Sequence, residues 1–352
     1  MTAFEVAVAG VRPLDDHAGA EAAALHDRLA KPQGALGRLE TVGIQLAAIA
    51  GTCPPPVPEP VTVAVFAGDH GVFAEAVTPW PQEVTAQMVS AFCAGGAAVN
   101  VLARHAGAQV LVVDVGVAAD LPPAPGLLRR KVRRGTANLL WGPAMTVDEA
   151  RQALDVGAEV AADAVEGGAR CLVTGDMGVA NTTASAALIA ALTGRPAADV
   201  TGRGTGIDDE TFTRKVLIIE AAVFRAAAGA GDPLVVLAAV GGLEIAAIAG
   251  FIVGGAAAGV PVVVDGVIAL AALLVATAVA PGSVDYCIAG HRSTEPGATA
   301  ALEYLGLSPL LDLGMRLGEG TGAVLAVPLV QAAAKVLGEM ATLDAAGVTR
   351  KD

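Results

Sequence analysis

VTVAVFAGDHG, residues 61–71, is the stretch that decides the fold. Its apolar run is short, rich in valine and closed by glycine, aspartate and histidine, which is typical of a strand buried on both faces of a parallel sheet. Five more runs follow this pattern: VLVVDVG (110–116), RCLVTGDMG (170–178), LVVLAAVGG (234–242), PVVVDG (261–266) and VDYCIAGH (284–291). These runs predict six strands.

Stretches with helical character separate the runs, over residues 82–105, 146–167, 181–193, 208–230, 244–259 and 267–280. This alternation predicts an α/β fold with a doubly wound, mostly parallel, Rossmann-like six-stranded sheet. Glycine supplies 43 of the 352 residues, which favours close packing of helices on the sheet. Ligands of such sheets bind outside the carboxyl ends of the strands, so the polar residues there are the candidates for chemistry.

Both ends of the chain have helical character without strands. We expect two helices within residues 15–50, joined near 31–37, and one long helix over 320–341. The segment CPPPVPEP (53–60) reads as a stiff linker. The sequence therefore predicts a small helical domain from residues 1–55 plus 320–352 and a large α/β catalytic domain over 56–319.

Composition excludes several classes of function. Acidic residues outnumber basic ones, 35 to 22, and the net charge of −13 argues against nucleic-acid binding and against attachment to anionic lipid. With 54% hydrophobic and 16% charged residues the chain is not disordered. Four scattered cysteines and no signal peptide predict a cytoplasmic protein. No set of His, Cys or Asp has metal-ligand spacing, so we expect no metal.

A membrane hairpin over residues 245–264 and 266–284 is an alternative, because neither stretch carries a charge and each approaches the ~20 residues that span a bilayer. Pro261 and the Gly254-Gly255 pair interrupt the first stretch. No Lys or Arg lies between Arg225 and Arg292 to orient a hairpin. Buried elements of an α/β fold produce the same hydropathy, and we favour that interpretation.

Two glycine-rich loops are candidates for phosphate binding. GDMGVANTT (175–183) follows a strand and opens a helix, where backbone N–H groups and the helix dipole favour an anion. In it, Asn181 and either Thr182 or Thr183 can cap the helix and also donate to a phosphate, or the segment is an ordinary capped connection. TGRGTG (201–206) is followed by Lys215, one of five lysines, which reads either as a phosphate ligand or as a solvated helix lysine.

Three further segments carry polar residues at strand or helix ends. Glu319 lies between two glycines in LGEGTG, where a lone carboxylate suits a general base or, alternatively, a helix-start carboxylate. Asp69-His70 and the segment HRSTEP (291–296) can bind polar substrate atoms or serve the structure, for instance through an Arg292–Glu295 ion pair.

Eight ordered motifs give a family resemblance over roughly residues 15–345: KPQGALGRLE (31–40), FAGDHGV (66–72), PQEVTAQMV (81–89), GDMGVANTT (175–183), GRGTG (202–206), VGGLEIAAIAGF (240–251), HRSTEPG (291–297) and LGEGTGA (317–323). Together they resemble the nicotinate-nucleotide–dimethylbenzimidazole phosphoribosyltransferases. The resemblance implies transfer of 5-phosphoribosyl from nicotinate mononucleotide to 5,6-dimethylbenzimidazole, giving α-ribazole 5′-phosphate and nicotinate in cobalamin biosynthesis. It implies a homodimer, a Rossmann-like sheet with a small helical domain, and neither redox cofactor nor metal.

The resemblance also assigns residues. It implies that Glu319 is the catalytic base that allows inversion at C1′. It places the nucleotide and base against the 175–183 loop and further nucleotide contacts on the 202–206 loop and Lys215; the residues are Asp176, Met177, Gly178, Asn181, Thr182, Gly204 and Lys215. Gln87 and Leu317 fall at the expected benzimidazole pocket, with Trp80 nearby. Two rival functions stay open on the residues alone: a non-catalytic nucleotide-binding regulator and the membrane hairpin protein.

Overall fold

The computed structural model describes residues 1–227 and 231–349, and six parallel strands form one sheet within it. Their order is β3-β2-β1-β4-β5-β6. The strands are β1 Val61–Gly68, β2 Ala108–Gly116, β3 Leu127–Arg129, β4 Cys171–Met177, β5 Val262–Val264 and β6 Cys287–Ala289. The chain runs outward from β1 in one direction and then from β4 in the other. The predicted α/β class and six-stranded parallel sheet are confirmed, with β1 and β4 meeting at the point where the strand order reverses.

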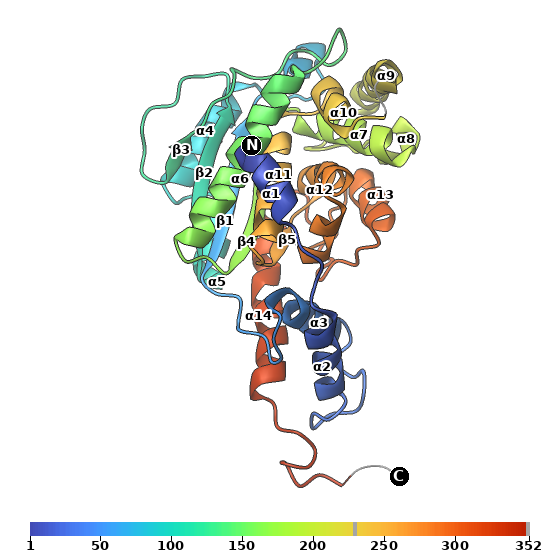
Figure 1. Cartoon of the computed structure of the whole chain (residues 1–352). Coiled ribbons are helices and arrows are strands. Elements are labelled where there is room, and N and C mark those ends of the chain that lie inside the picture. The colour runs from blue at the N-terminus through green and yellow to red at the C-terminus, as the bar shows by residue number, and fades with distance from the viewer. Residues whose placement is uncertain (228–230, 350–352) are drawn as a thin grey trace.

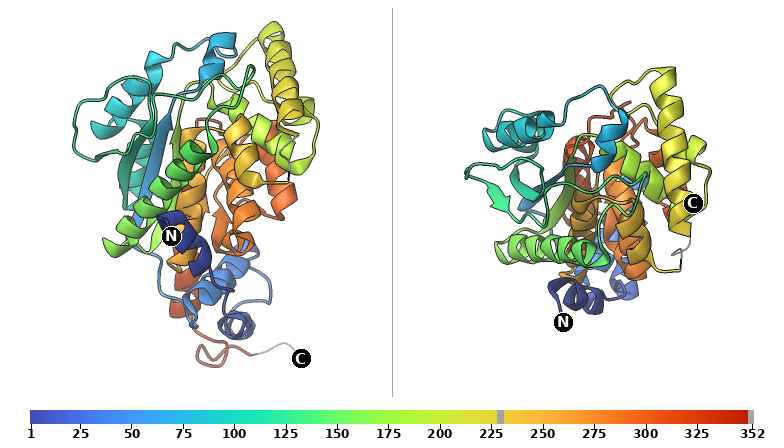
Figure 2. Two further views of the ribbon diagram at one scale, coloured as in Figure 1. Left: turned by 45° about the horizontal axis from the view of Figure 1, so that its top comes forward. Right: turned by 90° about the horizontal axis from the view of Figure 1, so that it is seen from above.

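Helices cover both faces of the sheet (Figures 1 and 2). One face carries the larger layer, with the helices α6 Val147–Glu166, α7 Asn181–Thr193, α9 Asp209–Ala226, α10 Pro233–Val240, α11 Leu243–Ala257, α12 Val267–Val279 and α13 Pro296–Leu305. The other face carries α4 Glu83–Cys93, α5 Ala98–Ala106 and α14 Thr321–Glu339. The remaining elements are α1 Ala3–Gly10, α2 Asp16–His26, α3 Arg38–Ala50, α8 Ala197–Val200 and the 3-10 turns Gly71–Glu75 and Pro281–Tyr286.

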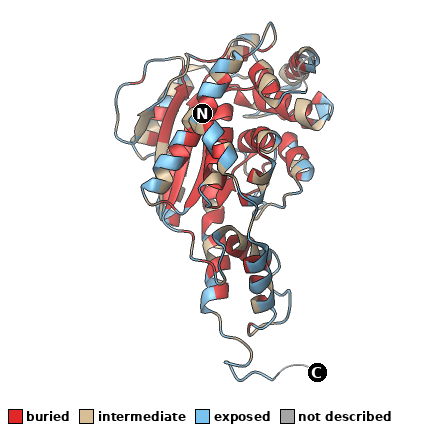
Figure 3. Cartoon of the chain, in the orientation of Figure 1, coloured by how far each residue is buried: buried red, intermediate tan, exposed pale blue. Residues whose placement is uncertain are grey.

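Strand β1 shows why the sheet is buried on both faces. Every residue from Val61 to Gly68 is buried, and alternate side chains enter different cores. Ala64 and Phe66 join the core under α6, α7, α11 and α12, whereas Val63 and Val65 join the core under α4, α5 and α14. The burial colours follow this division, with red strands between helices whose outer sides are blue (Figure 3).

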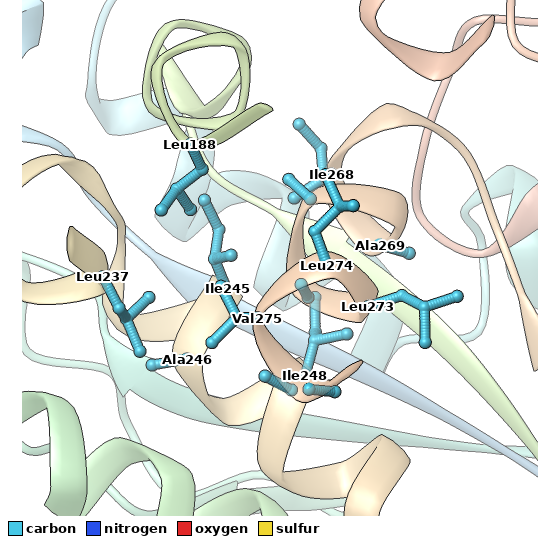
Figure 4. Packing of buried hydrophobic residues seen from close by; sticks show 14 of the residues in the cluster. Leu188, Leu237, Ile245, Ala246, Ile248, Ile268, Ala269, Leu273, Leu274 and Val275 are labelled. Atoms are coloured by element: carbon cyan, nitrogen blue, oxygen red, sulfur yellow. The ribbon is translucent and has the colours of Figure 1, made fainter. Parts of the chain in front are cut away.

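Small residues let the helices approach closely, as the glycine content predicts. A Cβ on Gly157 of α6 would lie 1.8 Å from the carbonyl oxygen of Ala247 on α11. The reciprocal contact is as tight, because a Cβ on Gly250 would lie 2.0 Å from the carbonyl oxygen of Leu154. Helix α11 is buried from Leu243 to Ala256, and its isoleucines pack with leucines of α10 and α12 (Figure 4).

The structure overturns one predicted strand and adds one that was not predicted. Residues 234–242 do not form a strand: they lie mostly in α10, whose N-cap Asp232 accepts a hydrogen bond from Leu234 N–H and whose first residue is Pro233. An eight-residue apolar run surrounded by other helices has the composition of a buried strand. The sixth strand is instead β3, a three-residue edge strand that pairs with β2 and that no sequence pattern predicted.

Several predicted helices are confirmed with adjusted ends. The stretch 82–105 is two helices, α4 and α5. The helix expected over 208–230 is α9, and its last predicted residues, 228–230, lie outside the described residues. The two expected N-terminal helices are α2 and α3, and α14 corresponds to the helix expected over 320–341.

The two ends of the chain meet below the sheet, where α2 and α3 lie beside the C-terminal half of α14 (Figure 1). Helix α1 is separate from them and packs on α6 and α11, with Asp155 accepting a hydrogen bond from Phe4 N–H. The division into a small helical domain (1–55 plus 320–352) and a large catalytic domain (56–319) remains our proposal, and the contacts of α1 place that helix on the large one.

The apolar stretches behind the membrane alternative are α11 and α12, with β5 between them. At 15 and 13 residues they are shorter than the ~20 that a bilayer requires, and both are buried in the protein. The structure therefore contradicts the hairpin. By length and composition alone, 83–106 and Thr321–Glu339 could cross a membrane; the first is interrupted between α4 and α5, and the second packs on α3 and α5.

Candidate active site

A cavity of about 370 Å³ opens at the carboxyl ends of the strands, where the strand order reverses between β1 and β4. This volume lies in the range of ligand sites, ~300–1,000 Å³. Ten of the eleven predicted site residues line it: Trp80, Asp176, Met177, Gly178, Asn181, Thr182, Gly204, Lys215, Leu317 and Glu319. The eleventh, Gln87, is exposed on α4 and does not line the cavity, whereas Val84 and Met88 of the same segment do.

The loop after β4 brings backbone close to backbone. A Cβ on Gly178 would lie 2.3 Å from the carbonyl oxygen of Gly68, so only glycine is accommodated there. Ala180 precedes α7 with a left-handed φ of 73° and provides no side-chain cap. The predicted capping by Asn181 is wrong: its Nδ2 donates to Asp176 Oδ2 at 3.0 Å. The open N-terminus of α7 therefore faces the cavity, as an anion site requires.

Lys215 is a buried cation in the cavity wall, only 1% exposed. The solvated-lysine alternative is therefore wrong. Its Nζ donates to Thr182 Oγ1 at 2.8 Å and to the Gly202 carbonyl at 3.2 Å. Burial lowers the pKa of Lys215 to about 8, and the charge of Glu295 acts against this. Glu295 in turn accepts a hydrogen bond from Gly204 N–H at 2.9 Å, which joins the second glycine-rich loop to the lysine.

Glu319 is buried in a strained turn just before α14. It has a φ of 64°, between Gly318 at 81° and Gly320 at 89°. A non-glycine residue in this region costs of order 1–3 kcal/mol and marks a functional constraint. Within the described residues its Oε2 has no hydrogen-bond partner. Burial raises the pKa of Glu319, the backbone N–H of Val99 opposes this, and Asp265 raises it further. A free, basic carboxylate oxygen thus lies in the cavity wall.

Asp176 is a second buried carboxyl of the cavity. Burial raises its pKa well above the usual range, and the charges of Asp265, Glu244 and Glu319 act in the same direction against the hydrogen bond from Asn181. This shift favours the neutral form of Asp176 over that of an ordinary aspartate, which weakens its repulsion of an anionic ligand.

The mouth of the cavity is apolar. Met177, Val84 and Met88 lie with Trp80 and Leu317, and the last two are 50% and 58% exposed. Large exposed apolar side chains around a cavity mark a site for an apolar ligand or for another protein surface.

The other strand-end residues divide between the cavity and the fold. Asp69 and His70 do not line the cavity: Asp69 Oδ2 accepts Ala118 N–H at 2.8 Å, and His70 Nε2 lies 2.6 Å from Glu244 Oε1. The predicted Arg292–Glu295 ion pair is wrong, because Arg292 pairs with Asp312 at 3.6 Å. His291, Ser293 and Glu295 line the cavity, and they belong to the segment HRSTEP, for which substrate binding was one of two predicted alternatives. Arg203 and Arg316 also line it, and neither had an individual role predicted from the sequence. Their signal was position, since each lies in a quoted motif or just before one.

Comparison with known proteins agrees with this geometry. The sequence profile of a phosphoribosyltransferase family matches residues 11–348. A protein of Salinispora tropica named nicotinate-nucleotide–dimethylbenzimidazole phosphoribosyltransferase is 56% identical over 99% of this chain and 100% of its own length. One of the same name from Chloroflexus aggregans is 55% identical over 97% of this chain and 96% of its own.

A solved structure shares the fold in detail. The crystal structure of CobT from Thermus thermophilus superposes with a TM-score of 0.92 at 52% identity, covering 95% of this chain and 100% of that one. The α/β sheet and its cavity thus define a phosphoribosyltransferase. The chain belongs to the family whose curated members carry the name nicotinate-nucleotide–dimethylbenzimidazole phosphoribosyltransferase.

Proposed function

We propose that this enzyme transfers the 5-phosphoribosyl group of nicotinate mononucleotide to 5,6-dimethylbenzimidazole, in the assembly of the cobalamin nucleotide loop. The products are α-ribazole 5′-phosphate and nicotinate. The observation that carries the proposal is the pairing, in one cavity, of a buried cation, Lys215, with a buried carboxylate, Glu319, whose Oε2 has no partner among the described residues. The Lys215 ammonium suits a phosphate, and the Glu319 carboxylate suits a proton that leaves the acceptor during the reaction.

The nucleotide half of the reaction uses the polar side of the cavity. The 5′-phosphate binds Lys215, Thr182 and the N-terminus of α7, and Gly204 lets the second loop approach it. The pyridinium nitrogen of the substrate becomes neutral when its bond to C1′ breaks, because it keeps the bonding electron pair. Nicotinate is therefore a good leaving group and needs no acid.

The acceptor half uses the apolar side. The flat benzimidazole lies against Met177, Leu317 and Trp80, and one ring nitrogen attacks C1′ from the face opposite nicotinate, which inverts that carbon. The other ring nitrogen loses its proton to Glu319 as the new bond forms, so the product is neutral. Glycines on both sides of Glu319 leave room for the ring beside the backbone. Such a positioned base typically contributes ~10²–10⁴-fold.

The test is incubation of the protein with nicotinate mononucleotide and dimethylbenzimidazole, followed by chromatography. We expect nicotinate and α-ribazole 5′-phosphate in equal amounts. Binding of the nucleotide without release of nicotinate would instead favour the non-catalytic regulator.

We further propose a cytoplasmic homodimer. Exposed Trp80 and Leu317 form an apolar region at the cavity that a second copy can cover. Four free cysteines agree with a reducing compartment. The partners proposed for the cavity are the two small-molecule substrates, and neither nucleic acid nor membrane.

A further inference from the structure

Asp265 is a completely buried carboxylate at the end of β5, behind the wall of the cavity. Its Oδ2 accepts a hydrogen bond from Gly320 N–H at 3.2 Å, and its Oδ1 accepts one from Ala323 N–H at 2.9 Å. Its own backbone N–H donates to Thr174 Oγ1 of β4 at 3.0 Å. One residue therefore ties two strand ends to the start of α14.

These bonds hold the turn that carries Glu319. The first N–H groups of a helix have no partner within the helix, and Gly320 is the N-cap of α14 without a side-chain cap of its own. Asp265 accepts the N–H of Gly320, directly after Glu319, and the N–H of Ala323, the third residue of the helix. A glutamate with positive φ persists only where its surroundings over-determine it, and this carboxylate fixes the turn on its C-terminal side.

The packing around the turn leaves it little freedom. A Cβ on Gly320 would lie 2.9 Å from the Thr174 carbonyl oxygen, and a Cβ on Gly322 would lie 2.0 Å from the His291 ring. His291 Nε2 lies 3.3 Å from Asp265 Oδ1. The helix start is thus pressed onto the strand ends with the Asp265 carboxylate between them.

We propose that Asp265 is the positioning residue for the catalytic base: by accepting the N–H groups of Gly320 and Ala323 it holds the left-handed turn that directs the Glu319 carboxylate at the acceptor ring. The inference rests on the proposed function, since it concerns the base of that reaction. Asp265 does not line the cavity, so substitution should change turnover far more than nucleotide binding.

Its charge gives a second, independent effect. The ionisable groups around Glu319 come from several elements: Asp176 at the end of β4, Asp265 at the end of β5, His291 after β6, and Lys215 on α9 in the same cavity lining. Asp265 is the charged residue that raises the pKa of Glu319. Removing that charge should lower this pKa and let the base act at lower pH.

Asp265→Asn is the decisive variant, because it keeps the shape, removes the charge and turns one acceptor into a donor that faces an N–H group. We expect kcat to fall about 10- to 100-fold, as misplacement of a catalytic group does, with KM for nicotinate mononucleotide within about twofold of wild type. The acidic limb of the kcat profile should move to lower pH. A purely structural loss would lower the melting temperature without moving that limb.

Asp69→Asn is the matched control. Asp69 is also buried at a strand end and accepts a loop N–H, but it lies outside the cavity lining. We expect it to keep both kcat and the position of the acidic limb. Wild-type turnover in the same experiment tests the proposed function separately, so its failure is distinguishable from failure of this inference.

Amide hydrogen exchange of the wild-type enzyme supplies a test that does not depend on folding of the variant. Gly320 and Ala323 N–H have no intrahelical partner, so slow exchange at both reports the Asp265 bonds. Rapid exchange at both amides would overturn the proposal. So would an Asp265→Asn protein with wild-type kcat and an unmoved acidic limb, or one in which KM rises as much as kcat falls.

Discussion

Replacement of Lys215 by alanine is the sharpest probe of nucleotide recognition. The ammonium group is buried and already holds two oxygen acceptors, Thr182 Oγ1 and the Gly202 carbonyl, with the Glu295 carboxylate close by. A phosphate in the cavity adds a charged acceptor to a donor whose position is fixed before binding. The variant therefore removes a prepared interaction and not a mobile surface charge.

The magnitude follows from the kind of bond. A hydrogen bond to a charged group contributes about 1.5–3 kcal/mol in a buried setting. At about 1.4 kcal/mol per factor of ten, kcat/KM for nicotinate mononucleotide should fall roughly 10- to 100-fold. Nicotinate riboside, which has no phosphate, should be used equally by both proteins.

The pH dependence has a defined sign. Burial lowers the pKa of Lys215 to about 8, so the lysine carries its charge below that pH and loses it above. Wild-type kcat/KM, which reports the free enzyme, should therefore fall as pH rises through about 8. In Lys215→Ala this basic limb should be missing.

The assay is initial-rate release of nicotinate at saturating dimethylbenzimidazole, from about pH 6 to about 9.5 on either side of the lysine's titration. Lys335→Ala is the matched control, because Lys335 is an exposed lysine on α14 outside the cavity lining. Unchanged nucleotide kinetics in Lys215→Ala would refute the assignment. An equal loss with the riboside would also refute it, because the lysine would then act on something other than the phosphate.

Four further outcomes are expected. Glu319→Gln should bind nucleotide but lose at least ~100-fold in kcat. The rate with an N-methylated benzimidazole, which has no ring proton to lose, should be the same in the variant and the wild type. Wild-type kcat should fall with acid at a pH above the usual carboxylate range, because the pKa of Glu319 is raised. Rates with mono- and dimethylated benzimidazoles should differ by no more than about 10- to 200-fold, since a methyl group in the apolar pocket of Met177 and Leu317 discriminates by only ~1–3 kcal/mol; a thousandfold preference would contradict this. Light scattering should give twice the chain mass of 34.7 kDa, and a monomer at micromolar concentration would exclude the dimer. Gly157→Ala should destabilise the protein by ~2 kcal/mol or more in denaturant titrations, because the methyl group would overlap the Ala247 carbonyl; an unchanged midpoint would contradict the close helix crossing.

Much of the sheet was predictable because buried parallel strands consist almost entirely of apolar residues. Val61–Gly68 is buried along its whole length, so nothing in its sequence competes with the strand pattern. The same logic fails at α10, where a short helix is also apolar around most of its surface. Asp232-Pro233, a cap followed by the residue favoured at a first helical position, was the local signal that distinguishes them. Strand β3 has no such signal, since three residues on an edge carry no periodicity.

Site residues could be predicted where the local sequence is unusual. They could not be predicted where their role depends on contacts with distant parts of the chain. Glu319 between glycines is visible in the sequence, and so is a lysine after a glycine-rich loop. Asp265 was visible only as the polar end of a strand, because its role depends on contacts to Gly320 and Ala323, which are 55 and 58 residues away in the chain. The partner of Arg292 depends likewise on a later loop, so spacing suggested the wrong ion pair.

A net charge of −13 raises the question of how such a protein retains an anionic nucleotide. In the structure, the negative charge of the carboxyl groups at the strand ends is reduced by burial or offset by neighbouring histidines. Asp176 has its pKa raised by burial and by three neighbouring carboxylates. Glu244 and Asp265 each lie against a histidine, and although burial lowers the pKa of His70 and His291, these carboxylates raise both above their usual range. The cavity wall then holds Lys215 with the Glu295 charge beside it, Arg203 paired with Asp209, Arg316, and the start of α7, which no side chain caps. Glu319 keeps one carboxylate oxygen without a partner among the described residues. Because an anion and a proton acceptor repel each other, a site that needs both must separate them, and here they come from different elements, the lysine from α9 and the glutamate from the turn before α14.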